Sequence, residues 1–129
     1  MLINERMIEE IEEMAAESPR LRMNYNLHEG PDSLSHRLIN VLLPGTPMPV
    51  HRHAHSDETF IILRGKLFVV FYDETGAEIE RFLLDSSIGN FGVNIPSNQW
   101  HGIEVMETSA IFEVKDGPYT PLTPENILY

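Results

Sequence analysis

The segment from Gly45 to Gly65 constrains this chain most, because it spaces potential metal ligands along extended backbone. His51 and His53 are two residues apart, so a strand would turn both imidazoles to one face. A short turn follows, and Glu58 opens the apolar run after it. The next antiparallel strand could therefore direct its carboxylate toward the two histidines. The spacing predicts β-structure built around a metal site.

A fourth ligand is expected from a distant segment of the chain. His101 follows a turn signal at Asn98 and opens another strand-like run. Asparagine tolerates positive φ better than other non-glycine residues, so Asn98 can make such a turn. His55 also forms a His-x-His pair with His53, but it leaves only two residues before Glu58. We expect His55 to face solvent or to support the site from the turn.

Composition limits the classes of protein that this chain can represent. Its 129 residues suit one domain, and 42% of them are hydrophobic. The net charge of −11 argues against binding to nucleic acid, which needs a basic face. There is no cysteine, so a metal must be held by imidazole and carboxylate groups. No signal-peptide pattern or membrane-spanning run is apparent, and we expect a cytoplasmic protein.

The first segment predicts a helix from Asn4 to Glu17. Apolar residues recur there at three- and four-residue steps, and glutamates cover the opposite face. Asn4 is a suitable N-cap, and Ser18 before Pro19 ends the helix because the residue before proline avoids the α region.

Residues 19–28 alternate apolar and polar side chains, which is typical of a strand with one polar face. The polar positions are Arg20, Arg22, Asn24, Asn26 and His28. Two guanidinium groups and two amides suit the binding of phosphate, carboxylate or sugar hydroxyls. The alternative is an edge strand whose charges guard against aggregation, and spacing alone favours that alternative.

The rest of the chain reads as short strands divided by glycine, proline and asparagine turns. They are expected at residues 34–43, 48–53, 58–64, 66–73, 78–84, 91–95, 100–106 and 110–115. This pattern predicts an antiparallel sandwich or barrel, with a double-sheet jelly roll as the natural closure. The tail from residue 117 is rich in proline and should wrap the surface without adding a strand.

The central motif resembles a known signature. The pattern G-x5-H-x-H-x4-E-x6-G fits Gly45, His51, His53, Glu58 and Gly65, and it is similar to the first signature of the cupin superfamily. The second cupin signature is kept only in part. It appears at residues 96–101, with asparagine at position 98 where the family has glycine.

Three further stretches resemble the WbuC-type cupin metalloproteins, which are associated with surface polysaccharide gene clusters. They are Ser18–Asn24, Pro49–His53 with Glu58–Thr59, and Phe112–Tyr119. The resemblance implies one all-β cupin domain over residues 1–129, a double-stranded β-helix or jelly-roll barrel. It would comprise an N-terminal helix (1–18), the barrel (19–116) and a C-terminal tail (117–129). It also implies that the polar strand with Arg20, Arg22, Asn24 and Asn26 belongs to a substrate site.

These features predict a metal centre held by His51, His53, Glu58 and His101. Mixed nitrogen and oxygen ligation allows Fe, Mn, Ni, Co or Zn. The ligand is expected to be a small anionic or sugar-like molecule, and the protein to act on or bind a sugar or nucleotide sugar. The alternatives are a non-catalytic metabolite-binding or regulatory cupin, an iron-dependent dioxygenase and a metal-free sugar epimerase.

No free acid or base is obvious from the sequence. The residues that we consider as catalytic candidates are Tyr25, His28 and Tyr119. The apolar side of the first strand and the apolar anchors of the tail predict a homodimer, because two-fold assembly commonly covers such surfaces.

Overall fold

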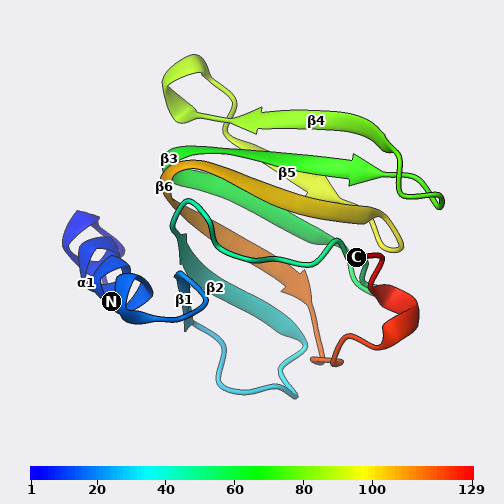
Figure 1. Ribbon diagram of the computed structural model, residues 1–129. Helices are drawn as coiled ribbons and strands as arrows, with labels where there is room; N and C mark the ends of the chain where they lie inside the picture. Colours follow the sequence, from blue (N-terminus) through cyan, green and yellow to red (C-terminus); the bar gives the residue numbers. More distant parts are fainter.

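The computed structural model describes all 129 residues and shows an antiparallel β-barrel with one helix outside it (Figure 1). Helix α1 spans Glu5–Glu17. The strands are β1 (Arg22–Asn26), β2 (Ser35–Leu42), β3 (Glu58–Tyr72), β4 (Glu78–Leu84), β5 (Gly92–Ile95) and β6 (Trp100–Asp116). Two short 3₁₀ helices are η1 (Ser86–Ile88) and η2 (Pro124–Asn126). The predicted fold class, a jelly-roll barrel with an N-terminal helix, is confirmed.

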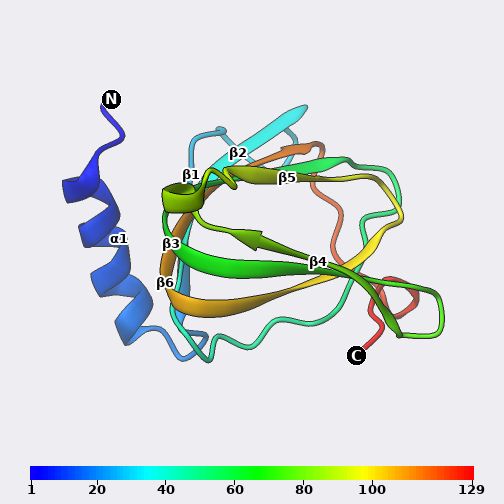
Figure 2. The ribbon, with the colours of Figure 1, turned by 90° about the horizontal axis from the view of Figure 1, so that it is seen from above.

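The strands pair in the order β1-β2-β6-β3-β4, and β5 pairs with the first residues of β3. Seen from above, they curve around a common interior (Figure 2). We call the side of the strands that faces this interior the inner face. It carries a buried apolar cluster of Leu42, Phe60, Ile62, Leu67, Val69, Phe71, Leu84, Ile95 and Ile111. No helix of the structure has the length and apolar character needed to cross a membrane.

Helix α1 forms as the sequence predicts. The side chain of Asn4 accepts a hydrogen bond from the Met7 amide at 3.1 Å and caps the helix, and Ser18 ends it. Ile8, Ile11 and Ala15 are its buried residues. They pack on Ile39, Val41 and Ala110 of β2 and β6, on the side of these strands that faces away from the barrel interior. Figure 1 shows the helix beside the barrel.

β3 and β6 are longer than predicted, because they continue through expected breaks. Separate strands were expected on the two sides of Gly65 and at residues 100–106 and 110–115, and these boundaries are wrong. Gly65 has φ 90°, which favours glycine, and the pairing of β3 with β6 shifts register around it. The expected turn is therefore a β-bulge that bends both strands.

This bend brings the two ends of the β3–β6 pair together. Glu58 pairs with Lys115 at one end, and Phe71 pairs with His101 at the other. A straight strand would separate positions 58 and 71 by about 40 Å. Glu58 Oε1 nevertheless lies 3.3 Å from His101 Nε2. The two halves of the paired strands therefore face each other across the barrel.

The segment at residues 48–53 was expected to be a strand and instead makes only isolated bridges. The backbone of His51 exchanges hydrogen bonds with His101 at 3.0 and 2.9 Å. On its other side the segment meets the C-terminal tail, where the Leu128 amide donates to Val50 and the Val50 amide donates to Tyr129, both at 2.7 Å. The tail thus packs beside the segment that carries the first predicted ligand.

Register assigns charged residues of β6 to the inner face. Ala110 and Phe112 pack toward α1, whereas Ile111 belongs to the interior cluster. Side chains alternate along a strand, so Glu113 and Lys115 share the inner face with Ile111. On the neighbouring strand β2, Ile39 and Val41 face α1 and the even-numbered residues face inward.

Replacing Gly65 by alanine should destabilise the protein strongly. Alanine would have to adopt φ 90°, and its Cβ would overlap the carbonyl oxygen of Thr108 and lie against Ser109. We expect a loss of at least about 3 kcal/mol in the free energy of unfolding, measured by urea denaturation. Gly89→Ala is the matched control, because Gly89 has φ 83° with nothing within 4 Å of an added Cβ. It should cost only about 1 kcal/mol; equal losses in both variants would contradict the role of the bulge.

Candidate functional site

Four side chains from three segments of the chain converge in the structure. Nitrogen atoms of His51, His53 and His101 all lie within 4.8 Å of one another. Glu58 joins them from the start of β3, with Oε1 at 3.3 Å from His101 Nε2 and 3.7 Å from His53 Nε2. The structure thus brings together all four predicted ligands. His55 is exposed on the turn between His53 and Glu58.

Local backbone structure places the histidines. The His51–His101 bridge holds two of them side by side, with ring centroids 4.4 Å apart. Asn98 adopts φ 67° in the turn before β6, as its position in the sequence predicts. Its amide donates to the carbonyl of His53 at 2.8 Å, which ties the third histidine to the same turn.

Hydrogen bonds fix the orientation of two rings. His51 Nδ1 lies 2.9 Å from the carbonyl oxygen of Pro49, and His101 Nδ1 lies 2.9 Å from that of Gln99. A carbonyl can only accept, so each Nδ1 carries the proton. When such a ring binds a metal, Nε2 directs its lone pair into the cluster. This is the arrangement of a metal-binding histidine, whose second nitrogen is held by a backbone or carboxylate acceptor.

Two atoms of the cluster lack hydrogen-bond partners although they are buried. They are Glu58 Oε1 and His101 Nε2, which lie 3.3 Å apart without the alignment of a hydrogen bond. Buried polar atoms are almost always satisfied, so each exception needs an explanation. A cation between the three imidazoles and the carboxylate would supply a partner for both atoms, and the donor set of nitrogen and oxygen suits a divalent transition metal.

Electrostatics keep the cluster in a form that can bind a metal. Burial is the main reason that the pKa of His53 is lowered to about 4. Burial and the neighbouring His101 also lower the pKa of His51. Burial would raise the pKa of Glu58, but contact with His101 outweighs it and the pKa lies below its ordinary value. At neutral pH the two histidines are neutral and the carboxylate is charged.

The polar strand is shorter than expected and only part of it faces inward. β1 begins at Arg22, and Arg20 lies exposed on the turn before it, so the predicted strand start at residue 19 is wrong. Arg22, Asn24 and Asn26 pair with Leu42, Asn40 and Leu38, which places them on the inner face. The Arg22 guanidinium donates to the carbonyl of Pro47 and to Thr46 Oγ1. It is therefore engaged in holding the loop before His51.

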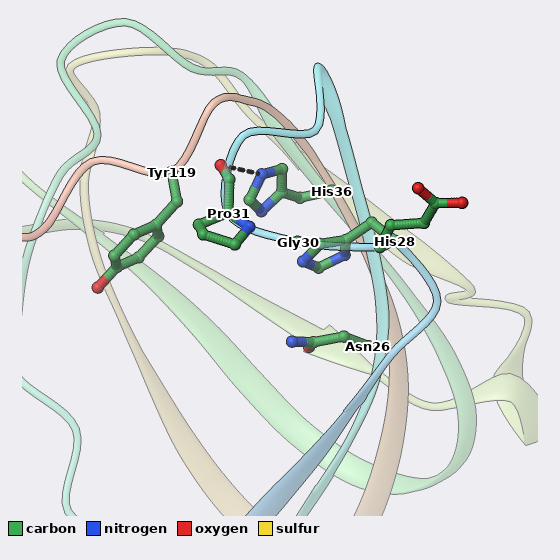
Figure 3. Close-up of a pocket in the computed structure, with 7 residues that line it drawn as sticks. Asn26, His28, Gly30, Pro31, His36 and Tyr119 are labelled. Carbon is green, nitrogen blue, oxygen red and sulfur yellow. Dashed lines mark hydrogen bonds between the residues drawn. The ribbon is translucent and has the colours of Figure 1, made fainter.

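The three predicted catalytic candidates separate into two groups. Tyr25 pairs with Ile39 on the side of the sheet that faces α1, and it is exposed away from the histidine cluster. His28 and Tyr119 instead line one cavity of about 510 Å³ together with Asn26 (Figure 3). We call this the His28 cavity. His36 also lines it and stacks on His28 with ring centroids 4.1 Å apart.

The sequence analysis did not single out three residues of the inner face: Asn40, Glu113 and Lys115. Asn40 Nδ2 donates to Glu113 Oε1 at 3.0 Å, and its own Oδ1 is buried without a partner. Burial and the nearby Glu58 raise the pKa of Glu113 to about 8. The alternation of Ile111, Glu113 and Lys115 was the available signal, because it places two charged residues on the same face as an apolar one.

A second cavity, of about 380 Å³, opens beside the cluster. His53 and His55 line it on one side, and residues 120–123, 125 and 126 of the tail line it on the other. The tail therefore lies against the side of the cluster where His53 is partly exposed.

Glu113→Gln should change how stability depends on pH. The folded-state pKa of about 8 lies above the ordinary 4.5, so the folded protein holds an extra proton between these values. Stability of the wild type should fall as pH rises from about 5 to 8, by on the order of 2 kcal/mol after allowance for partial exposure. Glutamine keeps the contact with Asn40 and should remove this fall in stability with rising pH. The melting temperature of both proteins is measured at a series of pH values, in EDTA to exclude bound cations. If it depends on pH in the same way in both proteins, the pKa assigned to Glu113 is contradicted.

Solved structures share the fold of this chain. CapF from Staphylococcus aureus, a capsular polysaccharide assembling protein, matches 87% of the chain with a TM-score of 0.68 and 20% identity, but this chain spans only 30% of CapF. The cupin domain of Schizosaccharomyces pombe Cnp3 gives a TM-score of 0.59 at 15% identity, covering 74% of this chain and 64% of that one. KdgF from Halomonas sp. gives 0.59 at 17% identity, covering 80% and 84%. At these identities the likeness shows the cupin fold.

Sequence comparison identifies the family. No curated protein matches the chain. A family model described as a domain of unknown function, DUF6016, matches residues 3–84, which is more than half of the 129 residues. The match includes His51, His53 and Glu58 and ends before His101. The chain has the cupin fold and belongs to the DUF6016 family.

Proposed function

We propose that this protein is a metal-dependent cupin in which His51, His53, Glu58 and His101 hold a divalent transition metal. The observation that carries the proposal is the pair of buried, unpartnered atoms Glu58 Oε1 and His101 Nε2, which lie beside two further imidazoles. A buried polar atom without a hydrogen-bond partner lowers the stability of the fold, so a bound cation that contacts both atoms would stabilise this cluster. Fe, Mn, Ni, Co and Zn all accept such ligands.

We propose further that the ligand is a sugar or nucleotide sugar used in surface polysaccharide metabolism. A bound metal would act as a Lewis acid toward the oxygens of such a molecule. Two observations support the substrate class. The first is the resemblance to the WbuC-type cupins at Ser18–Asn24, at Pro49–His53 with Glu58–Thr59, and at Phe112–Tyr119. The second is that CapF, which shares the fold, is a capsular polysaccharide assembling protein.

Glu113 favours an enzyme over a purely binding cupin. A binding module needs no ionisable group beside its metal, whereas catalysis needs a group that can give or take a proton near neutral pH. Glu113 lies on the inner face, and its pKa of about 8 keeps it protonated at pH 7. Asn40 holds the carboxyl in place through Nδ2 at 3.0 Å. Glu58, as a metal ligand, would not be available for this role.

Removing any proposed ligand should reduce both metal content and stability. We expect His51→Ala, His53→Ala, Glu58→Ala and His101→Ala to lose most of the metal that the wild type carries after purification without added metal, because each removes one of four donors. EDTA should lower the melting temperature of the wild type by several degrees and leave these variants nearly unchanged. Elemental analysis and thermal unfolding are the measurements.

His55→Ala is the control for that series, since His55 is exposed outside the cluster. It should keep its metal and its response to EDTA. Full metal retention in His101→Ala would remove the fourth ligand from the proposal, and a wild type without metal would overturn it.

A cytoplasmic homodimer is also part of the proposal. Ile61 and Leu63 point outward from β3, and Phe91 lies beside them before β5, so three large apolar side chains are exposed together. Association would remove them from water. Light scattering at micromolar concentration should give twice the monomer mass, and Ile61→Asp should shift the protein toward monomer. A monomer mass for the wild type would contradict the dimer.

A further inference from the structure

Lys115 is a cation without an anionic partner on the inner face, near the end of β6. On β6 it pairs with His36 of β2 on one side and with Glu58 of β3 on the other. These three side chains therefore form a row from the His28 cavity to the histidine cluster. The ion pairs of the protein include none with Lys115, whereas the other lysine, Lys66, contacts Asp85 and Glu107.

The ammonium group of Lys115 lies between the His28 cavity and the histidine cluster. Its Nζ lies 5.6 Å from the centre of the Tyr119 ring, a cation–π distance, and Tyr119 lines the His28 cavity. The same charge helps to lower the pKa of His51 and His53, so it acts within electrostatic reach of the cluster. In a protein of net charge −11, an incoming anion needs such a local positive region.

The His28 cavity has the chemistry of a site for a hydroxylated ring. Its volume of about 510 Å³ lies in the range of small-molecule sites. Figure 3 shows Asn26, His28 and Tyr119 around one space. Nδ1 of His28 is bonded to the backbone of Arg37, which leaves Nε2 for a ligand. The amide, imidazole and phenol can exchange hydrogen bonds with hydroxyl groups, and the Tyr119 ring offers an apolar face.

His36 supports this wall of the cavity rather than offering a free donor. Its Nε2 donates to the carbonyl of Pro31 at 3.2 Å, as the dashed line in Figure 3 shows. Its ring stacks on His28. Glu29, the one acidic residue of the lining, is exposed and would repel an anion placed beside it. The anionic group of a ligand is therefore expected at the Lys115 side of the cavity.

We propose that Lys115 receives the anionic group of a sugar acid or sugar phosphate whose ring occupies the His28 cavity, with the histidine cluster on the other side of Lys115. This inference rests on the proposed function and names the anion-binding residue of that site. Lys115 takes the anion-binding role that the sequence predicts for Arg20 and Arg22. Arg20 is exposed on a turn, and Arg22 is engaged by Pro47 and Thr46.

Calorimetric titration of the metal-loaded protein with D-glucuronate, D-glucose 1-phosphate and D-glucose tests the inference. The wild type should bind one of the two anions more tightly than glucose, and that anion identifies the group as carboxylate or phosphate. Lys115→Met should weaken binding of this anion at least about tenfold, as expected for one charge-assisted contact, and leave glucose unchanged. Asn26→Ala should weaken all three sugars, because it lines the part of the cavity that receives the ring.

Two controls separate charge at the site from charge in general. Arg37→Met removes one positive charge from the exposed, outward side of β2, next to His36, and should leave all affinities unchanged. Lys115→Arg keeps the charge and should retain most of the affinity, which also guards against misfolding of the methionine variant. Wild-type affinity in Lys115→Met, or no binding of either anion by the wild type, would overturn the inference.

Metal analysis of every variant distinguishes failure of the anion site from failure of the proposed metal-dependent function. Lys115→Met should carry as much metal as the wild type, since Lys115 donates no ligand. If all proteins hold metal and Lys115→Met binds anions normally, only the anion site is wrong. If the wild type holds no metal, the metal-dependent function itself is wrong.

Discussion

The bend in the paired strands β3 and β6 is the constraint on which the site depends. Without it, Glu58 and His101 would sit at opposite ends of a long ladder, about 40 Å apart. Gly65 permits the bend because it adopts φ 90° where a side chain would strike Thr108. The fold therefore creates the cluster of three histidines and Glu58 by closing the barrel, and the same closure encloses the apolar core.

Closing the barrel also gathers charges that must be balanced. Glu58 and Glu113 both lie on the inner face. Burial, together with repulsion by Glu58, raises the pKa of Glu113 to about 8 and keeps it protonated near neutral pH. Lys115 lies on the same face without an ion-pair partner. An interior with one ionised acid, one protonated acid and one free ammonium group is costly to maintain for stability alone. We propose that this interior is a site for a cation and an anionic ligand.

Sequence reasoning succeeded where the signal was local. The capped helix followed from apolar spacing after Asn4. The convergence of His51, His53 and Glu58 followed from their spacing across a short turn, although residues 48–53 form only isolated bridges. It failed at Gly65, where a glycine was interpreted as a break although the backbone only bulges. Glu113 and Lys115 were missed because the face that they occupy depends on the register between β2, β6 and β3. That register is set by tertiary contacts.

The central claim is that the barrel closes around a metal held by three imidazoles and one carboxylate. X-ray absorption spectroscopy of protein purified without added metal tests it most directly. The account predicts one transition metal with nitrogen and oxygen neighbours at about 2.0–2.2 Å, the outer-shell scattering of three imidazole rings, and no sulfur. A metal-free protein, or a first shell without imidazole scattering, would contradict the account.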